Sequence, residues 1–236
     1  MMPIFEDTGA ALVGVFSLVM TLACYFGAKY AYDKYKFWWL SPIMLAPLGI
    51  VSLVLLLDIP LTSYFQFSQL LTLMLTPAVI AFAVPIYRER HLIAKYPLTL
   101  SIGVLVGLFL GLLSSWGLSK LVSLPPELSQ SVLVRFVSTP FAMEATSSFG
   151  GLPELTAMLV LLTGVLGMLI CEPIFRMAKI NTSLGKGAAL GASAHGVGAA
   201  KASEIGEEEG VVASLTMIFT GIAMVIMAPL FSLFLV

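Results

Sequence analysis

Four ionisable residues stand out because the segments around them are apolar or built from small side chains: Glu144, His195, Lys201 and Glu204. Charged groups at membrane depth are costly, so each needs a partner or a function. His195 is a candidate to bind a substrate or carry a proton, since the unperturbed pKa of histidine is about 6.5. Lys201 is a candidate to bind an anion, and Glu144 and Glu204 are candidates to couple transport to a proton or cation. Each residue also has a structural alternative. Glu144 can pair with Arg135, Lys201 can pair with Glu204 on one helix face, and His195 can make hydrogen bonds without a functional role.

Two short motifs predict helices that begin inside the membrane. Ser138, Thr139 and Pro140 form one of them, and Thr76 and Pro77 form the other. A threonine hydroxyl accepts hydrogen bonds from the open N–H groups of a following turn, and proline suits the first helical position. The open N–H groups and positive end of such a half-helix can hold an anion, as transporters do for a substrate carboxylate. These five residues are therefore candidates for substrate binding.

Signatures of enzymes and metal sites are missing from the sequence. It contains no GxSxG, HExxH or phosphate-loop motif. The stretch EIGEEEG, Glu204 to Gly210, lacks the spacing of a calcium loop and predicts a solvated turn between two helices. Cys24 and Cys171 lie in apolar runs and predict packing residues. We expect no catalytic residue, metal or cofactor, and an intramembrane enzyme is the third alternative for function.

Composition places the chain in the membrane. Of 236 residues, 59% are hydrophobic and 11% are charged, whereas soluble domains are about 25% charged. The net charge of −1 and the lack of a long basic run give no reason to expect nucleic acid as a partner. Six windows approach the roughly 20 apolar residues that a spanning helix needs: Thr8 to Ala28, Trp38 to Leu57, Ser68 to Ile86, Leu98 to Leu118, Leu155 to Ile170 and Val211 to Leu235. The sequence predicts an all-α, polytopic helical bundle, one transmembrane domain over residues 1–236 with N-terminal spans at 8–57 and a core at 64–236.

Basic residues in the short loops predict the orientation. Three clusters are expected on the cytoplasmic side: Lys29 to Lys36, Arg88 to Lys95 and Arg176 to Lys186. The N-terminal segment is acidic, with Glu6 and Asp7, and is expected outside. The stretch between Leu118 and Leu155 must then begin and end outside. A re-entrant hairpin fits this stretch better than a full crossing.

Small residues predict close packing between helices. Gly103, Gly107 and Gly111 fall on one helix face, which allows close helix approach. Between Gly185 and Ala202, 12 of 18 residues are Gly or Ala, which predicts a broken or re-entrant segment packed within protein rather than against lipid. Large residues at Gly196 or Gly198 are expected to overpack it. The two Thr-Pro pairs are 63 residues apart and hint at an internal, inverted repeat.

Three stretches carry a family resemblance: LTPAVIAFAVPIY, VSTPFAMEATSSFGGLPELTA and LGASAHGVGAAKASEIGEEEG. They resemble the bacterial LrgB/CidB family, which includes the YohK-like inner-membrane proteins and the membrane half of the plant plastidial glycolate/glycerate translocator. The resemblance runs from Tyr64 to the C-terminus. Where relatives tend to read Gly-Thr-Ala-Arg, this chain reads Gly-Ala-Ala-Lys, with Lys201 in place of the arginine. The bidentate fork of arginine is therefore lost at this position.

The resemblance implies a multi-pass protein of the bacterial cytoplasmic (inner) membrane and two competing functions. One is a carrier for small monocarboxylates of the glycolate, glycerate or pyruvate class, coupled to protons or cations. The other is a holin/antiholin-like modulator of murein hydrolase activity and lysis. The carrier is the favoured hypothesis, because a few polar groups converge rather than lining one amphipathic face. Expected partners are the lipid bilayer, the carboxylate, and either a small LrgA-like membrane protein or further copies of the chain.

Overall fold

The computed structural model describes residues 8–235, and over this range the regular structure is helical, without a β-strand. Five helical segments are long and apolar enough to cross a membrane, and they are Ala11–Tyr35, Leu61–Arg88, Pro97–Leu121, Pro153–Met177 and Glu207–Leu235. A shorter apolar helix covers Pro42–Leu56. All six predicted windows fall on these helices, which confirms the all-α membrane fold. Glu6 and Asp7 lie outside the described residues.

The chain divides into two compact units, the first reaching Pro77 and the second beginning at Ala78. The first unit contains α1 (Thr8–Tyr35), a short 3-10 helix (Trp38–Leu40), α2 (Pro42–Leu56) and α3 (Leu61–Leu73). Helix α1 packs against both α2 and α3. The absence of a side chain at Gly14 leaves room for Phe67, and the hydroxyls of Thr21 and Tyr64 are 3.1 Å apart.

The unit boundary falls within α4 (Leu75–Ala81), which is followed by α5 (Ala83–Arg88) and α6 (Arg90–Lys95). The helix before it stops at Met74, and α4 resumes at once. Met74 keeps right-handed φ and ψ of −71° and −10°, and Leu61–Arg88 counts as one apolar span, so the half-helix predicted to begin at Thr76-Pro77 is not formed. Pro77 is the third residue of α4, where a backbone N–H has no hydrogen-bond partner within the helix, so the N–H that proline lacks is not missed there.

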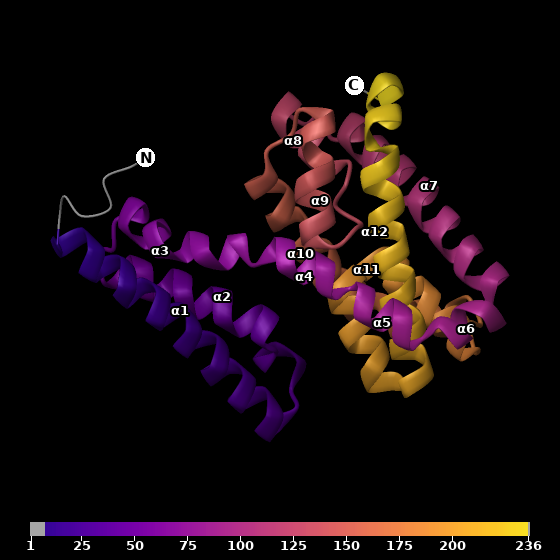
Figure 1. The fold of residues 1–236 in the computed structure, drawn as a ribbon, viewed down its shortest axis with the longest axis horizontal. Helices are drawn as coiled ribbons and strands as arrows, with labels where there is room; N and C mark the ends of the chain where they lie inside the picture. Colours follow the sequence, from indigo (N-terminus) through magenta and orange to yellow (C-terminus); the bar gives the residue numbers. More distant parts are fainter. Residues whose placement is uncertain (1–7, 236) are drawn as a thin grey trace. The chain divides into compact units, whose positions relative to one another are not determined.

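Three long helices form the frame of the second unit: α7 (Pro97–Leu121), α10 (Pro153–Met177) and α12 (Glu207–Leu235). Proline begins α7 and α10, where its missing N–H removes no helical bond. The C-terminal ends of α7 and α12 meet near Lys120 and Leu235, and their N-terminal ends meet near Leu100 and Val212. These two helices therefore run in the same direction, and α10 runs against them (Figure 1).

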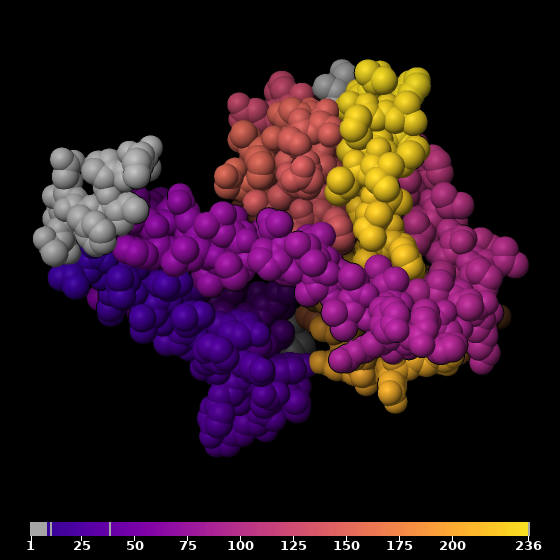
Figure 2. All heavy atoms as spheres, in the orientation of Figure 1, coloured from indigo at the N-terminus to yellow at the C-terminus, as the bar shows by residue number. Residues whose placement is uncertain are grey.

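The segment between α7 and α10 folds as a hairpin, called hairpin A here and covering residues 126–146. It contains α8 (Pro126–Val132) and α9 (Thr139–Thr146). Both ends of hairpin A lie beside the start of α10: the Leu152 N–H donates to Ser131 Oγ at 2.9 Å, and the hydroxyls of Thr146 and Thr156 are 2.8 Å apart. The segment therefore forms a hairpin, as predicted, and its re-entry into the membrane stays a prediction. In space-filling view its side chains lie against the yellow C-terminal half of α12 (Figure 2).

A second hairpin, called hairpin B, is formed by α11 (Ser183–Ile205). Its helix is broken at His195, where φ is 42° and ψ is −125°. Before the break Leu190 packs with Phe175 of α10, and after it Lys201 pairs with Glu172 of the same helix. The two halves therefore run along one stretch of α10 in opposite directions.

Small residues let these elements approach closely, as predicted. A Cβ added at Gly107 of α7 would lie 2.6 Å from the Cβ of Ala192, and one at Gly103 would lie 3.2 Å from the Cβ of Ala188. At Gly111 the added atom would overlap the ring of Phe136 in hairpin A. The glycine face of α7 therefore holds both hairpins.

Candidate functional site

The tip of hairpin A places a cation beside the middle of α10. Arg135 donates from a guanidinium nitrogen, Nη1, to Thr163 Oγ1 at 3.3 Å. Thr163 lies 11 residues beyond Leu152, about 16 Å along the helix. The Nε of Arg135 is buried and has no hydrogen-bond partner among the described residues, and no described carboxylate lies within ion-pair distance of it. Arg135 therefore has capacity to bind an anion.

The start of α9 lies at the same tip, three residues after Arg135. Its N-cap is Ser138, with extended φ and ψ of −65° and 148°, and Thr139 is already the first helical residue. The prediction that Thr139 caps this helix is therefore off by one residue, because Pro140 is tolerated at the second helical position as well as the first. The Ser138 side chain is buried and its hydroxyl makes no capping bond and no other hydrogen bond to described residues.

His195 forms the tip of hairpin B and is 3% exposed, which places the ring fully inside the protein. Its Nε2 lies 3.0 Å from the carbonyl oxygen of Val160, so this nitrogen carries the proton and donates. A Cβ added at Gly164 would lie 2.7 Å from His195 Cε1. The positive φ of a non-glycine residue is a strained conformation that the surrounding packing must hold in place.

The two tips meet α10 at the same level from opposite ends of the unit. Arg135 contacts Thr163, while His195 contacts Val160 and Gly164. These positions lie at the middle of the 25-residue helix. A half-helix begins at each tip, α9 after Ser138 and the second half of α11 after His195. Each such end carries about half a positive charge and N–H groups without a helical partner.

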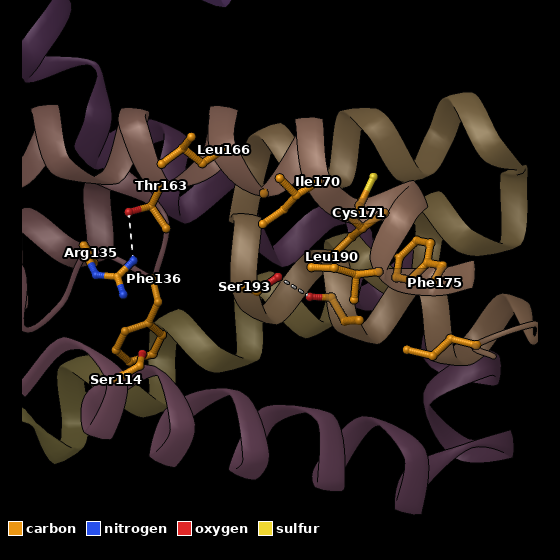
Figure 3. Close-up of a pocket in the computed structure, with 14 residues that line it drawn as sticks. Ser114, Arg135, Phe136, Thr163, Leu166, Ile170, Cys171, Phe175, Leu190 and Ser193 are labelled. Atoms are coloured by element: carbon orange, nitrogen blue, oxygen red, sulfur yellow. Dashed lines mark hydrogen bonds between the residues drawn. The ribbon is translucent and has the colours of Figure 1, made fainter. Parts of the chain in front are cut away.

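A cavity of about 410 Å³ lies beside Arg135 (Figure 3). Four of its lining residues carry polar side chains near the tips or middle of the helices: Ser114, Arg135, Thr163 and Ser193. The remainder of the lining is apolar apart from Cys171, and Arg135 is its only charged residue among the described ones. The cavity can hold a small molecule with one negative charge.

Only some of the site residues predicted from sequence lie near the tips of the two hairpins. Ser138, Thr139, Pro140 and His195 lie at or next to the two tips. Glu144 is exposed on α9 and makes no ion pair with Arg135, so that structural pairing is not formed.

The other predicted residues lie away from the tips. Lys201 pairs with Glu172 at 3.1 Å and with Glu204 at 3.6 Å, so the expected Lys201–Glu204 pair is confirmed and Lys201 already has two carboxylate partners. Thr76 and Pro77 are exposed and belong to the first unit.

Arg135 is the candidate that sequence reasoning did not select as a binding residue. The sequence pattern suggests it only as a partner for Glu144. The signal was present, because a lone arginine sits in the apolar stretch SVLVRFV just before the Ser-Thr-Pro motif. A cation at membrane depth is by default a functional candidate.

Comparison with known proteins shows which family the chain belongs to. The model of the LrgB-like family matches residues 21–234. The chain belongs to the LrgB-like family. The uncharacterized protein YwbG of Bacillus subtilis is 36% identical over 217 residues, which cover 92% of this chain and 96% of YwbG. The uncharacterized protein YxaC of Bacillus subtilis is 28% identical over 207 residues, which cover 88% of this chain and 90% of YxaC. No solved structure matches. The family match confirms the resemblance noted in the sequence, and the chain is a multi-pass membrane protein of this family.

Proposed function

We propose that this LrgB-like protein is a carrier for small monocarboxylates in the bacterial cytoplasmic membrane. The observation that carries the proposal is Arg135. Its guanidinium has one neutral partner, Thr163, and it lines a cavity at the level where two half-helices begin. A carboxylate in the cavity would supply acceptor oxygens for the guanidinium N–H groups that Thr163 does not occupy.

The protein environment favours a carrier over a holin-like pore, which is the second function that the family implies. A pore needs a continuous polar face that lines water after assembly. Here Arg135, Ser138 and His195 of the second unit instead lie at the hairpin tips. The long helix α10 exposes apolar side chains outside the cavity, namely Met158, Leu162 and Leu169. Hairpins that enter from opposite ends and meet at the middle also support alternating access to one central site.

Coupling to protons or cations is part of the proposal. One ring nitrogen of His195 donates to the carbonyl oxygen of Val160, and proton uptake by the other ring nitrogen is the coupling role proposed for this residue. Glu144 is exposed on hairpin A without an ion-pair partner among the described residues, so it can bind a proton or a cation as the anion arrives.

The test is uptake of labelled pyruvate, glycolate and glycerate into liposomes that contain this chain alone. Replacing Arg135 with Gln should reduce uptake about tenfold to a hundredfold, because a hydrogen bond to a charged group contributes about 1.5–3 kcal/mol. Arg135→Lys should retain part of the activity, since the charge remains but the planar fork is lost. Arg176→Gln, an exposed change near the end of α10, is the matched control and should transport normally.

Folded Arg135→Gln protein with undiminished uptake would contradict the proposal. Uptake by the chain alone would also show that an LrgA-like companion is dispensable. Leakage of large dyes from the same liposomes, in place of saturable uptake, would favour the holin-like function.

A further inference from the structure

A separate cavity of about 250 Å³, called the Lys120 cavity here, lies where the C-terminal ends of α7 and α12 meet hairpin A (Figure 1). Among the described residues it shares no lining residue with the cavity beside Arg135. The apolar span that contains Lys120 ends at Leu121, so the cavity lies near one end of the spanning segment. The orientation predicted from the basic loops places this end outside the cytoplasm. Dissolved molecules and lipid headgroups can both reach such a position.

The polar part of this lining is rich in hydrogen-bond donors. Helix α7 contributes the Lys120 ammonium and the Trp116 indole, and hairpin A contributes the Ser129 hydroxyl and the Gln130 amide. None of these side chains makes a hydrogen bond or an ion pair with a described residue. Ser119 donates to the carbonyl of Trp116 at 2.8 Å. The cavity therefore gathers several donors that have no acceptor within the described part of the chain.

The Lys120 cavity also carries a positive charge without a compensating carboxylate. Lys120 is the only charged residue among its described lining residues. Pro126, Ser129 and Gln130 have the spacing of one helix face, and Glu127, the nearest acid in the sequence, is not part of the lining. The helix dipole by itself favours a lysine in the last turn of α7. It does not account for the neutral donors that surround the ammonium.

We infer that the Lys120 cavity is a binding site for a singly charged oxyanion, separate from the site at Arg135. The ammonium supplies the opposite charge, and the indole, amide and hydroxyl groups supply directed hydrogen bonds to the oxygens. Two sources have this chemistry: the carboxylate of a small dissolved acid, and the phosphodiester of a phospholipid headgroup. The site does not depend on the carrier function proposed above.

Trp116 allows this binding to be measured directly. The chain has three tryptophans, so replacing Trp38 and Trp39 with Phe leaves Trp116 as the only one. In this background, purified protein in detergent is titrated at constant ionic strength with lactate or with dihexanoyl phosphatidylglycerol. The emission of Trp116 should change saturably. A response to lactate identifies a dissolved carboxylate as the ligand, and a response to the lipid alone identifies the headgroup.

Variants in the same background test whether the signal comes from the Lys120 cavity. Lys120 is exposed, so Lys120→Gln should fold normally and weaken binding about tenfold to a hundredfold, as expected for a lost hydrogen bond to a charged group. Lys179→Gln, an exposed change outside the lining, is the matched control and should bind normally.

Arg135→Gln distinguishes the two cavities. The response of Trp116 should persist in this variant whether or not the carrier function holds, because Arg135 does not line the Lys120 cavity. Loss of the response in folded Arg135→Gln would assign the signal to the other cavity and overturn the inference. The inference would equally fail if neither titrant gave a saturable response, or if folded Lys120→Gln bound as tightly as its parent.

Discussion

Hairpins A and B reach the same level of α10 from opposite ends, yet they are built from opposite kinds of side chain. Hairpin A buries the large rings of Phe136 and Phe141, and the cation at its tip, Arg135, lies beside a cavity. Hairpin B is built over much of its length from Gly and Ala, and its tip residue His195 is fixed by Val160 and by contact with Gly164. The tip of hairpin A lies beside a cavity that can hold a ligand, whereas the small side chains of hairpin B let backbone segments pack directly against one another.

This difference indicates which changes each hairpin should tolerate. In hairpin B, glycines face backbone atoms directly, as at Gly191, where an added Cβ would overlap the Ala213 carbonyl. Added volume there cannot be absorbed by a side-chain rotation. In hairpin A, by contrast, changes of charge or hydroxyl should alter binding more than they alter folding.

The largest effect is expected from volume added to hairpin B at Gly198. A Cβ there would overlap the Leu190 carbonyl and approach the Cβ of Ala194 at 2.8 Å, so Gly198→Ala should lower stability by about 1–3 kcal/mol. At Gly196 the nearest atom found is Met217 Sδ at 4.0 Å, so Gly196→Ala should be tolerated. This sharpens the expectation from sequence, which treated both glycines alike. Thermal unfolding of both purified variants in detergent measures the difference, and equal melting temperatures would contradict the packing of hairpin B.

The next largest effect is expected from a charge change in hairpin A. Glu144→Gln mimics the protonated carboxyl, so it should retain carboxylate counterflow and lose accumulation driven by a pH or sodium gradient. Because Glu144 makes no ion pair with Arg135, the change should also leave stability unaltered. Uptake into liposomes with and without an imposed gradient separates these outcomes. Equal loss of counterflow and driven uptake in a folded variant would refute the coupling role.

The smallest effect compares the two capping residues. Thr182 begins hairpin B, and its hydroxyl accepts from the Gly185 N–H at 3.2 Å, so Thr182→Ala should lower stability by about 1 kcal/mol. Ser138 occupies the corresponding position of α9 but makes no capping bond. Ser138→Ala should therefore leave the melting temperature unchanged. If the same variant binds the carboxylate more weakly, the Ser138 hydroxyl contacts the substrate directly. A fall in stability as large as that of Thr182→Ala would show that Ser138 has a capping role.

Much of the fold could be predicted because the membrane imposes strong rules on sequence. Apolar runs located the long helices, and basic loops required the stretch containing Ser138 to return to the side where it began. The glycine face at Gly103 and Gly107 also indicated close packing. These features depend on local composition, which the sequence states directly.

The remaining features depend on contacts between distant segments. The run of Gly and Ala predicts a broken or re-entrant segment, but its composition does not show which residue forms the reversal, so the turn could not be located at His195. The sequence also suggested Thr76-Pro77 as the counterpart of the Ser138 motif, but the second reversal is formed by α11. Arg135 became a binding candidate only when Thr163 and the cavity appeared beside it.

The central claim is that the cavity between hairpin A and hairpin B is where the carboxylate binds, and Ser193 offers the most direct test. Its side chain is exposed and lines the cavity (Figure 3). In a chain carrying Cys24→Ser and Cys171→Ala, the Ser193→Cys variant should react with a small maleimide at a rate that saturating pyruvate slows severalfold. Adding Arg135→Gln should abolish this protection. A labelling rate that pyruvate leaves unchanged, in protein that still transports it, would contradict the account.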